Sequence, residues 1–174
     1  MEINTDILII GAGGAGMYAA LAGAREGASV LLIDKNMVGR GGATVMAQMT
    51  VAVAIGHQEP DNWETRFSDT VKSGHGICNE ELTKLLCVNG PERIMEMDSW
   101  KVGWAQKDGT ILQVSAPGHS RKRCVYVDFL NTGPALASTL RKQVKREEKI
   151  GTISNLVITD ILVDEGRAVG AIGM

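Results

Sequence analysis

The sequence predicts an α/β fold in which helices cover a parallel sheet, and three features of residues 6 to 36 predict it. Residues 7 to 10 are all apolar and β-favouring, which is typical of a short buried strand. A glycine-rich turn then leads into an alanine-rich run that ends at Gly27 and predicts a helix. Residues 29 to 33 form a second, mainly apolar run that Asp34 and Lys35 close. The order strand, tight turn, helix, strand predicts a βαβ unit.

The turn between the first strand and the helix satisfies the pattern GxGxxG with Gly11, Gly13 and Gly16. Gly11 allows a sharp turn, Gly13 allows the backbone to approach a pyrophosphate, and Gly16 allows close packing of the helix on the sheet. Phosphates are favoured at such a helix start by its unpaired N–H groups and by the positive end of its dipole. We therefore expect Gly11, Gly13, Gly14, Ala15 and Gly16 to bind the pyrophosphate of a dinucleotide.

Asp34 stands 18 residues after Gly16, at the end of the second expected strand. From this place a carboxylate can accept hydrogen bonds from both hydroxyls of the adenine ribose, and it would repel the additional phosphate of NADP. Lys35 is expected near the same ribose. The alternative is a glycine-rich core turn that binds nothing. The strand before the glycines, the helix after them and the spacing of the acid favour a dinucleotide site.

Composition limits the class of protein. A chain of 174 residues is long enough for one core and short for two, and we expect residues 1 to 174 to form one domain. A net charge of −2 gives no indication of nucleic-acid binding. The first apolar run is interrupted by glycines after four residues, so we expect neither a signal peptide nor direct membrane insertion. Three cysteines without a CxxC motif favour reduced thiols, a cytoplasmic location and no metal site.

Residues 37 to 56 begin with Gly39, Gly41 and Gly42 and continue as a nearly uncharged run of small residues. Such a run is either a plain core segment or the lining of a cofactor. Its position directly after the expected ribose-binding acid favours the lining.

Helical patterns follow as far as Trp100. Asp61 is expected to cap a first helix, and Asn79 is expected to cap a second helix that ends at Gly90. Pro91 is expected to open a third, because proline suits a first helical turn. His75 is expected in a surface turn between the first two helices.

The remainder predicts a hairpin around Asp108 and Gly109, and a last helix capped by Asn131 or Thr132. Strands are expected at residues 153 to 163 and 168 to 172. The basic stretch PGHSRKR, residues 117 to 123, would either contact an anionic substrate or flavin phosphate or form a solvated loop, and the sequence favours the loop.

Several of these segments together resemble one family, the flavoprotein subunits of succinate dehydrogenase and fumarate reductase, with L-aspartate oxidase as a close relative. DILIIGAGGAGMYAALAGAREGASVLLIDK is similar to the FAD fingerprint of that family, with Asp34 in the place of the usual Glu. GATVMAQ resembles the segment beside the isoalloxazine ring. DTVKSGHGICNEEL, RIMEMDSWKVGW, GHSRKR, NTGPALASTLRKQV and ITDILVDEGRAVGAIGM follow in the family's order.

The resemblance implies a Rossmann-like FAD-binding domain with a β-hairpin insertion, which we expect to be a truncated N-terminal portion. It implies that Gly42, Ala43 and Thr44 line the flavin and that the backbone of Val157 contacts the adenine. Ala43 stands where covalent members carry a flavin-linked histidine, so FAD is expected to be held non-covalently.

Two further departures from the family's pattern concern the flavin and the reaction. The family's paired glycines are replaced here by Met49 and Thr50, beside the expected flavin position. No residue of this chain matches the family's catalytic proton donor or substrate clamp, which belong to segments beyond Met174, so we assign no catalytic residue. A sheet without its closing strand would expose apolar surface and an unpaired edge. We therefore expect the chain alone to be unstable or to be completed by another polypeptide.

The implied activity is hydride transfer between FAD and a dicarboxylate, with electrons passing to an iron–sulfur subunit or another acceptor. The implied partners are that iron–sulfur subunit or a complementing flavoprotein segment. Two alternatives stay open at this point. One is an NAD-binding dehydrogenase module, which the residues between Lys35 and the last helix disfavour because they predict three helices and a hairpin instead of a further βα unit. The other is a non-catalytic, truncated or split chain that only binds nucleotide or a partner.

Overall fold

A computed structural model of the chain describes residues 2–174, and they form two compact units. The first unit contains the residues up to Ala47 together with Leu136–Met174. The second unit is Gln48–Ala135. Each unit has its own sheet and helices, and each is described by itself.

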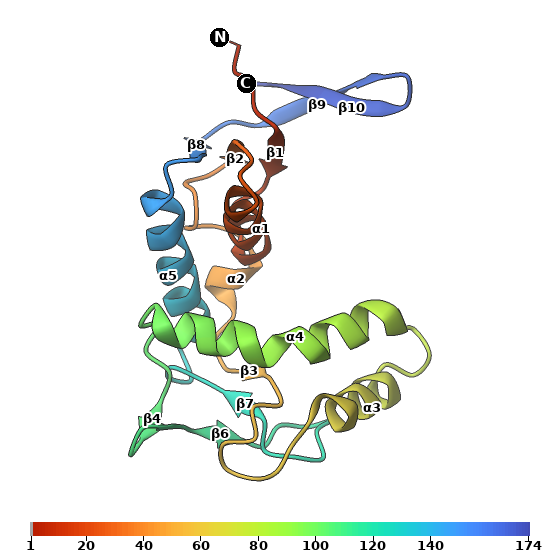
Figure 1. The fold of residues 1–174 in the computed structure, drawn as a ribbon, viewed down its shortest axis with the longest axis vertical. Coiled ribbons are helices and arrows are strands. Elements are labelled where there is room, and N and C mark those ends of the chain that lie inside the picture. Colours follow the sequence, from red (N-terminus) through yellow and green to blue (C-terminus); the bar gives the residue numbers. More distant parts are fainter. Residues whose placement is uncertain (1) are drawn as a thin grey trace. The chain divides into compact units, whose positions relative to one another are not determined.

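The first unit is built on a parallel sheet of three strands, β1 (Ile7–Ile10), β2 (Val30–Asp34) and β8 (Ile150–Ser154), in the order β1-β2-β8. Helix α1 (Gly14–Arg25) connects β1 to β2, as a parallel pair requires. The side of α1 that is buried carries Met17, Ala20, Leu21 and Ala24. The predicted βαβ unit and the α/β class are therefore confirmed (Figure 1).

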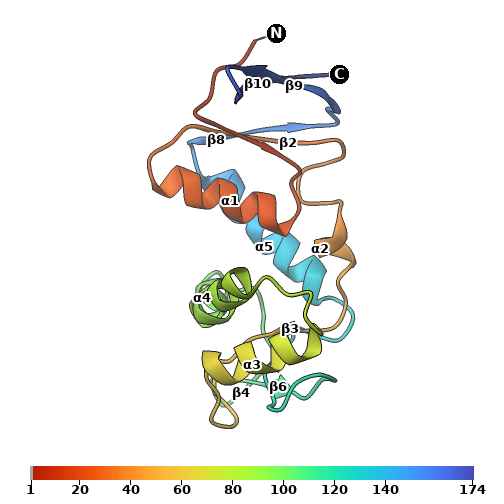
Figure 2. The same ribbon diagram turned by 90° about the vertical axis from the view of Figure 1, so that its right-hand side faces the viewer.

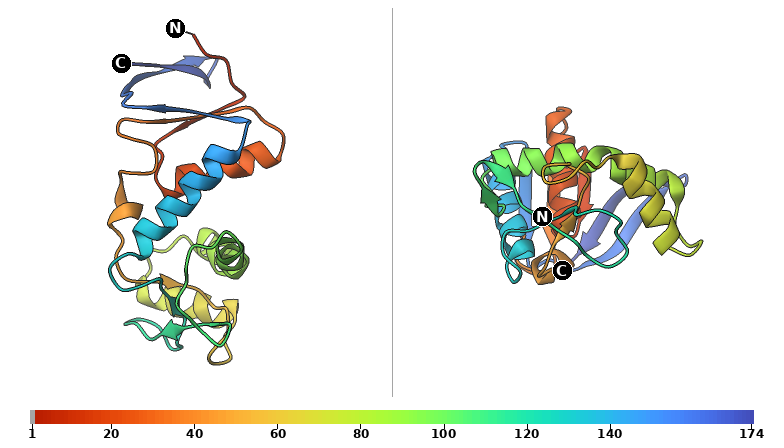
Figure 3. Two further views of the ribbon diagram at one scale, coloured as in Figure 1. Left: turned by 90° about the vertical axis from the view of Figure 1, so that its left-hand side faces the viewer. Right: turned by 90° about the horizontal axis from the view of Figure 1, so that it is seen from below.

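Helix α5 (Thr132–Arg146) leads into β8, and its part from Leu136 belongs to the first unit. In Figures 2 and 3 this part of α5 lies on the same side of the sheet as α1. The antiparallel hairpin of β9 (Ile158–Asp164) and β10 (Arg167–Gly173) lies on the other side. One short helix, α2 (Ala43–Met46), completes this unit.

The single strand expected at residues 153 to 163 is wrong: the structure divides it between β8 and β9. Asn155 has a positive φ of 58°, which ends the extended run. The N–H groups of Asn155 and Leu156 then donate to the carbonyls of Asn36 and Asp34, both at 3.1 Å. The chain leaves the parallel sheet at this point and re-enters an extended conformation as the first strand of the hairpin.

The second unit packs helix α3 (Trp63–Ser73) against helix α4 (Glu80–Ser99). Beside the helices lies an antiparallel sheet of β3 (Val51–Ala52), β7 (Cys124–Val125) and β6 (Gln113–Val114). The predicted hairpin is confirmed as β4 (Gln106–Lys107) and β5 (Thr110–Ile111), with positive φ at Asp108 and Gly109. His75 is exposed in a turn, also with positive φ. Across the described residues, no helix is both long enough and apolar enough to cross a membrane.

Two expectations in this unit are wrong. Residues 80 to 99 form one helix with Pro91 inside it, where two helices were predicted. Gly90 does not end a helix; a Cβ there would lie 3.0 Å from Arg66 Nη1 and 3.3 Å from Val53 Cγ2, so this glycine permits close packing. Asn62, and not Asp61, caps α3, since its side chain accepts from the N–H of Thr65 at 2.8 Å.

Candidate functional site

The candidate site is the glycine-rich turn between β1 and α1. Gly11 has a φ of +104°, which a residue with a side chain rarely adopts, and its N–H donates to the carbonyl of Ile33 at 2.7 Å. A Cβ on Gly16 would lie 1.9 Å from the carbonyl oxygen of Gly11. The first turn of α1 therefore packs directly on the backbone of the turn, as the motif predicts.

The start of α1 is left open for an acceptor. Gly13 is the N-cap and offers no side-chain cap, and the first turn carries no acidic residue. The first N–H groups of a helix have no intrahelical partner. Gly14 donates to the Thr44 hydroxyl at 2.9 Å. Within the described part of the chain, the N–H groups of Gly13, Ala15 and Gly16 have no hydrogen-bond partner, so three donors are unpaired at the positive end of the helix.

Asp34 ends β2 beside this turn. Its Oδ2 accepts from the N–H of Ala12 at 2.7 Å, and its Oδ1 accepts from the N–H of Asn36 at 2.8 Å. Each carboxylate oxygen has a second lone pair, so one further acceptor position remains on each. The carboxylate thus holds the turn and the end of β2 together and still has capacity for a bound hydroxyl.

The segment after β2 reaches the same turn. Gly39 donates to the carbonyl of Ala12 at 3.2 Å, and a Cβ on Gly39 would lie 3.0 Å from Met17 Sδ. Gly42 has a φ of +82° and open space where its Cβ would be. Ala43 is exposed and begins α2, and it brings Thr44 to the start of α1. The sequence placed Gly39 in an expected lining segment but did not predict its contact with the turn, which depends on the path of the loop.

Two of the expected site residues, Lys35 and Val157, adjoin Asp34 or a residue bonded to it. Lys35 is exposed next to Asp34. Val157 follows Leu156, whose N–H donates to the carbonyl of Asp34. Both polar backbone groups of Val157 pair with Met174, at 2.8 and 2.9 Å. Its N–H is therefore occupied, and only the second lone pair of its carbonyl oxygen remains for an adenine.

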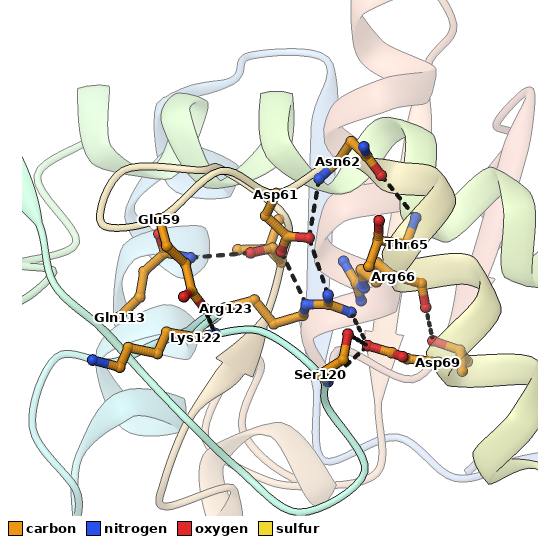
Figure 4. Close-up of polar contacts among 12 residues, drawn as sticks. Glu59, Asp61, Asn62, Thr65, Arg66, Asp69, Gln113, Ser120, Lys122 and Arg123 are labelled. Carbon is orange, nitrogen blue, oxygen red and sulfur yellow. Dashed lines mark hydrogen bonds and ion pairs between the residues drawn. The ribbon is translucent and has the colours of Figure 1, made fainter.

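The second unit contains a buried ion-pair cluster that sequence reasoning missed (Figure 4). The guanidinium of Arg123 donates from Nε and Nη2 to the two oxygens of Asp61, at 2.9 and 3.0 Å, and neither side chain is exposed. Arg123 Nη1 lies 2.9 Å from Asp69 Oδ2 as a charge contact without an aligned hydrogen bond. The prediction of a solvated basic loop is correct for Arg121 and Lys122, which are exposed, and wrong for Arg123.

This cluster shifts the pKa values of its neighbours. Burial opposes ionisation of Asp69, but hydrogen bonds from the N–H and hydroxyl of Ser120 and the charge of Arg123 outweigh it and lower the pKa. Burial and the positive charges of Arg123 and Arg66 lower the pKa of His119, whose Nδ1 is buried without a partner. The Lys122 N–H also donates to Glu59. The cluster thus joins the loop of residues 117 to 123 to α3.

Comparison with known proteins decides the family. Residues 6–174 match the model of the FAD binding domain family, which is nearly the whole chain. The chain belongs to this FAD-binding family. Its glycine turn is therefore the start of an FAD-binding domain, and the match disfavours the NAD-binding alternative.

The relatives of this FAD-binding domain are much longer proteins. Over 96% of its length the chain is 28% identical to the succinate dehydrogenase flavoprotein subunit of Rickettsia bellii, of which it covers 29%. Over 97% of its length it is 29% identical to the L-aspartate oxidase of Streptomyces coelicolor, of which it also covers 29%. A solved structure of a variant E. coli quinol fumarate reductase matches 99% of the chain with a TM-score of 0.92 and 28% identity, and 29% of that chain is covered. The chain thus spans about three tenths of the length of these relatives. Its similarity to them confirms the predicted resemblance.

Proposed function

We propose that this chain holds the ADP half of FAD non-covalently and serves as the FAD-binding portion of a fumarate reductase or succinate dehydrogenase-like oxidoreductase. The observation that carries the proposal is the open start of α1, where the N–H groups of Gly13, Ala15 and Gly16 have no partner among residues 2–174. Such groups bind phosphate oxygens in dinucleotide sites. The N–H of Gly14, now paired with Thr44, would join them, and Gly11 would shape the turn.

Asp34 would bind the adenine ribose. Both of its oxygens are already oriented by backbone N–H groups, and each keeps one lone pair for a ribose hydroxyl. Lys35 would lie beside the ribose in solvent, and the carbonyl of Val157 would accept from the adenine. The short Asp34 side chain thus combines two functions: it stabilises the turn and it recognises the ribose.

Gly42, Ala43 and Thr44 would face the flavin side of the cofactor. Gly42 has open space where its Cβ would be, and the Thr44 hydroxyl accepts from the N–H of Gly14, which would bind the pyrophosphate. The methyl group of Ala43 has no nucleophilic atom and forms no covalent bond to a flavin. Binding is therefore non-covalent in this proposal.

The bound FAD would supply hydride transfer to or from a dicarboxylate. The residues of this chain bind and orient the cofactor, and we assign none of them to proton transfer or substrate binding. The chemistry would need the segments that the longer relatives possess. We therefore propose that a complementing flavoprotein segment provides them, that electrons pass to or from an iron–sulfur subunit, and that the assembly works in the cytoplasm.

The test is retention of flavin by the purified chain and by two aspartate variants. The visible spectrum is recorded before and after addition of FAD and removal of the excess. Ala15→Asp places a negative charge among the N–H groups proposed to bind phosphate, so it should prevent FAD binding. It should not unfold α1, because an acidic residue in the first turn stabilises a helix. Ala19→Asp, one turn later on an exposed position of α1, is the matched control.

We expect the wild-type chain and Ala19→Asp to retain a flavin band and Ala15→Asp to lose it while its helix content is unchanged. Denaturation should release the flavin, since the proposal has no covalent link. A flavin that stays attached to the denatured chain would refute non-covalent binding. Equal retention by the two variants would place the cofactor elsewhere.

Fumarate turnover with a reduced dye separates this proposal from a non-catalytic nucleotide-binding chain. The non-catalytic alternative is kept because no described residue is assigned to proton transfer or substrate binding. We expect no turnover by this chain alone and turnover once the complementing segment is supplied. A complemented, flavin-loaded assembly without turnover would support the non-catalytic alternative.

A further inference from the structure

The loop of residues 117 to 122 contacts α3 chiefly at one atom, Oδ2 of Asp69. This oxygen accepts from the N–H and from the hydroxyl of Ser120, at 2.9 and 2.8 Å. It also lies 2.9 Å from Nη1 of Arg123, which follows the loop directly (Figure 4). Any new donor for this oxygen therefore competes directly with Ser120.

Two further contacts hold the ends of the loop. Ser73 Oγ donates to the carbonyl of Gly118 at 3.3 Å, and the N–H of Lys122 donates to the side chain of Glu59. Among the described residues, the middle of the loop makes no other hydrogen bond to α3. Ser120 is thus the residue that holds this middle part on the helix.

His119 adjoins Ser120 and brings a titratable ring into the same cluster. Its Nδ1 is buried and has no hydrogen-bond partner among the described residues, and the same holds for Nη1 of Arg123. In a neutral imidazole with its proton on Nε2, Nδ1 is an acceptor, while a guanidinium has only donors. The neutral ring therefore suits its arginine neighbour. A proton on Nδ1 would turn this acceptor into a buried donor.

Four charged side chains act on His119 from the segments around it. Burial and the charges of Arg123, next to β7, and Arg66, on α3, oppose a positive imidazole and lower its pKa. Asp69 on α3 and Asp61 before α3 act in the opposite direction. Both carboxylates already have donors, since Asp61 accepts from Arg123 with both of its oxygens and Asp69 accepts with Oδ2. The closed loop therefore favours the neutral ring.

We propose that this loop is an acid-sensitive switch, in which a proton on His119 releases Ser120 from Asp69 while α3 stays folded. A buried, charged donor without an acceptor is costly, and the ring can avoid this cost in two ways. It can move into solvent with the loop, or it can take Oδ2 of Asp69 as its acceptor. In both cases Ser120 loses its bonds to that oxygen. The buried pair of Arg123 and Asp61 does not use Oδ2 of Asp69 and remains in place.

The pH range of the switch follows from the two states of the loop. In the open loop the imidazole is in water and has the ordinary pKa of 6.5, and in the closed loop the pKa of His119 is lower. The closed loop is therefore fully favoured above pH 6.5. As the pH falls further, the open loop binds the proton more readily, and the ratio of open to closed molecules rises by up to about tenfold per pH unit until the closed pKa is reached. The pKa of Asp69 is lowered from 3.8, so its carboxylate is still charged when the open loop takes up its proton.

The measurement is hydrogen exchange at the Ser120 amide, expressed as a protection factor, by NMR between about pH 8 and about pH 5. The Thr65 amide is the internal reference, because it donates to the side chain of Asn62 on the same helix and that acceptor does not titrate. We expect the protection of Ser120 to fall by about tenfold or more while that of Thr65 is unchanged. The midpoint should coincide with the titration of the His119 ring in the same samples.

Two histidine variants assign the effect to one ring. His119→Gln removes the titrating group and should keep Ser120 protected over the whole pH range. His75→Gln makes the same change in an exposed turn and should respond like the wild type. Circular dichroism shows whether His119→Gln folds. If it does not, the agreement between the two midpoints in the wild-type chain decides.

Three outcomes would overturn the proposal. One is unchanged protection of Ser120 while the His119 ring titrates. Another is release of Ser120 in His119→Gln at the same pH as in the wild type. The third is an equal fall at Thr65, which would show that α3 unfolds as a whole. None of these depends on flavin retention, so this proposal and the proposed function can fail separately.

Discussion

The Ala12 N–H donates to Asp34 Oδ2 at 2.7 Å, joining two residues that are 22 positions apart in the chain. The second oxygen of Asp34 accepts from the N–H of Asn36. The residue proposed to bind the ribose therefore also stabilises the turn proposed to bind the pyrophosphate.

Asp34→Asn is predicted to weaken both the fold and FAD binding. An amide has one oxygen, so its NH₂ group must face one of the two N–H donors, and a donor left unpaired costs about 1 to 3 kcal/mol. We expect a lower urea midpoint and at least tenfold weaker binding of FAD by fluorescence titration. Asp34→Glu keeps the charge and should retain more flavin than Asp34→Asn. Equal affinity in wild type and Asp34→Asn would remove Asp34 from the ribose site.

Thr44→Val is predicted to destabilise the chain only while FAD is absent. The Thr44 hydroxyl accepts from Gly14 at 2.9 Å, and loss of a helix cap costs about 1 kcal/mol. A bound phosphate would accept the same N–H and compensate for the loss. Urea unfolding with and without saturating FAD measures this difference, with Thr44→Ser as the control that keeps the hydroxyl. A loss that is the same in both conditions would show that no phosphate replaces Thr44.

Gly16→Ala is predicted to destabilise the first unit by about 3 kcal/mol or more, because its Cβ would meet the Gly11 carbonyl at 1.9 Å and the backbone must shift. Gly23→Ala on the same helix is the control. Its Cβ would meet the end of the Ile7 side chain at 2.9 Å, which can move. Thermal unfolding should show a clearly larger fall for Gly16→Ala; similar falls would contradict the close contact of α1 with the turn.

Arg123→Met is predicted to unfold much of the second unit. It leaves the buried Asp61 carboxylate without its partner, and breaking a buried pair in this way costs about 3 to 5 kcal/mol. Lys122→Met, on the exposed neighbouring residue, should change stability by less than about 1 kcal/mol. Hydrogen exchange in α3 and α4 measures the effect, and unchanged protection in Arg123→Met would show that the cluster adds little stability.

Stability is predicted to fall as the pH drops below 6.5, because the pKa of His119 lies below this ordinary value in the folded chain. Burial and the charges of Arg123 and Arg66 hold the imidazole neutral, while Asp69 and Asp61 act in the opposite direction. An unfolded chain binds the proton more readily, so the contribution is complete above pH 6.5 and is lost as the pH falls through the folded pKa. His119→Gln should flatten this part of the stability curve. A separate loss below pH 3.8 is expected from Asp69, whose pKa is lowered.

Local patterns were sufficient to predict the glycine turn, α1, the β1–β2 pair and the hairpin at Asp108, because short-range backbone preferences and spacing decide them. They were insufficient at two places. Gly90 and Pro91 have the local pattern of a helix boundary, but packing of α4 against α3 maintains one helix. Asn155 breaks an apolar run whose pattern predicts one strand.

The sequence by itself determined that the chain begins with a dinucleotide-binding βαβ unit, since the residues that define it are close together in the chain. Only the tertiary structure decided which charges are buried and which donors are occupied. Arg123 is buried and its neighbour Lys122 is exposed, and Arg123 meets Asp61 and Asp69, from segments more than 50 residues away. Thr44 meets Gly14, and Asp34 meets Ala12, because the loops fold back on the turn. Such long-range contacts depend on the path of the backbone, which no local pattern specifies.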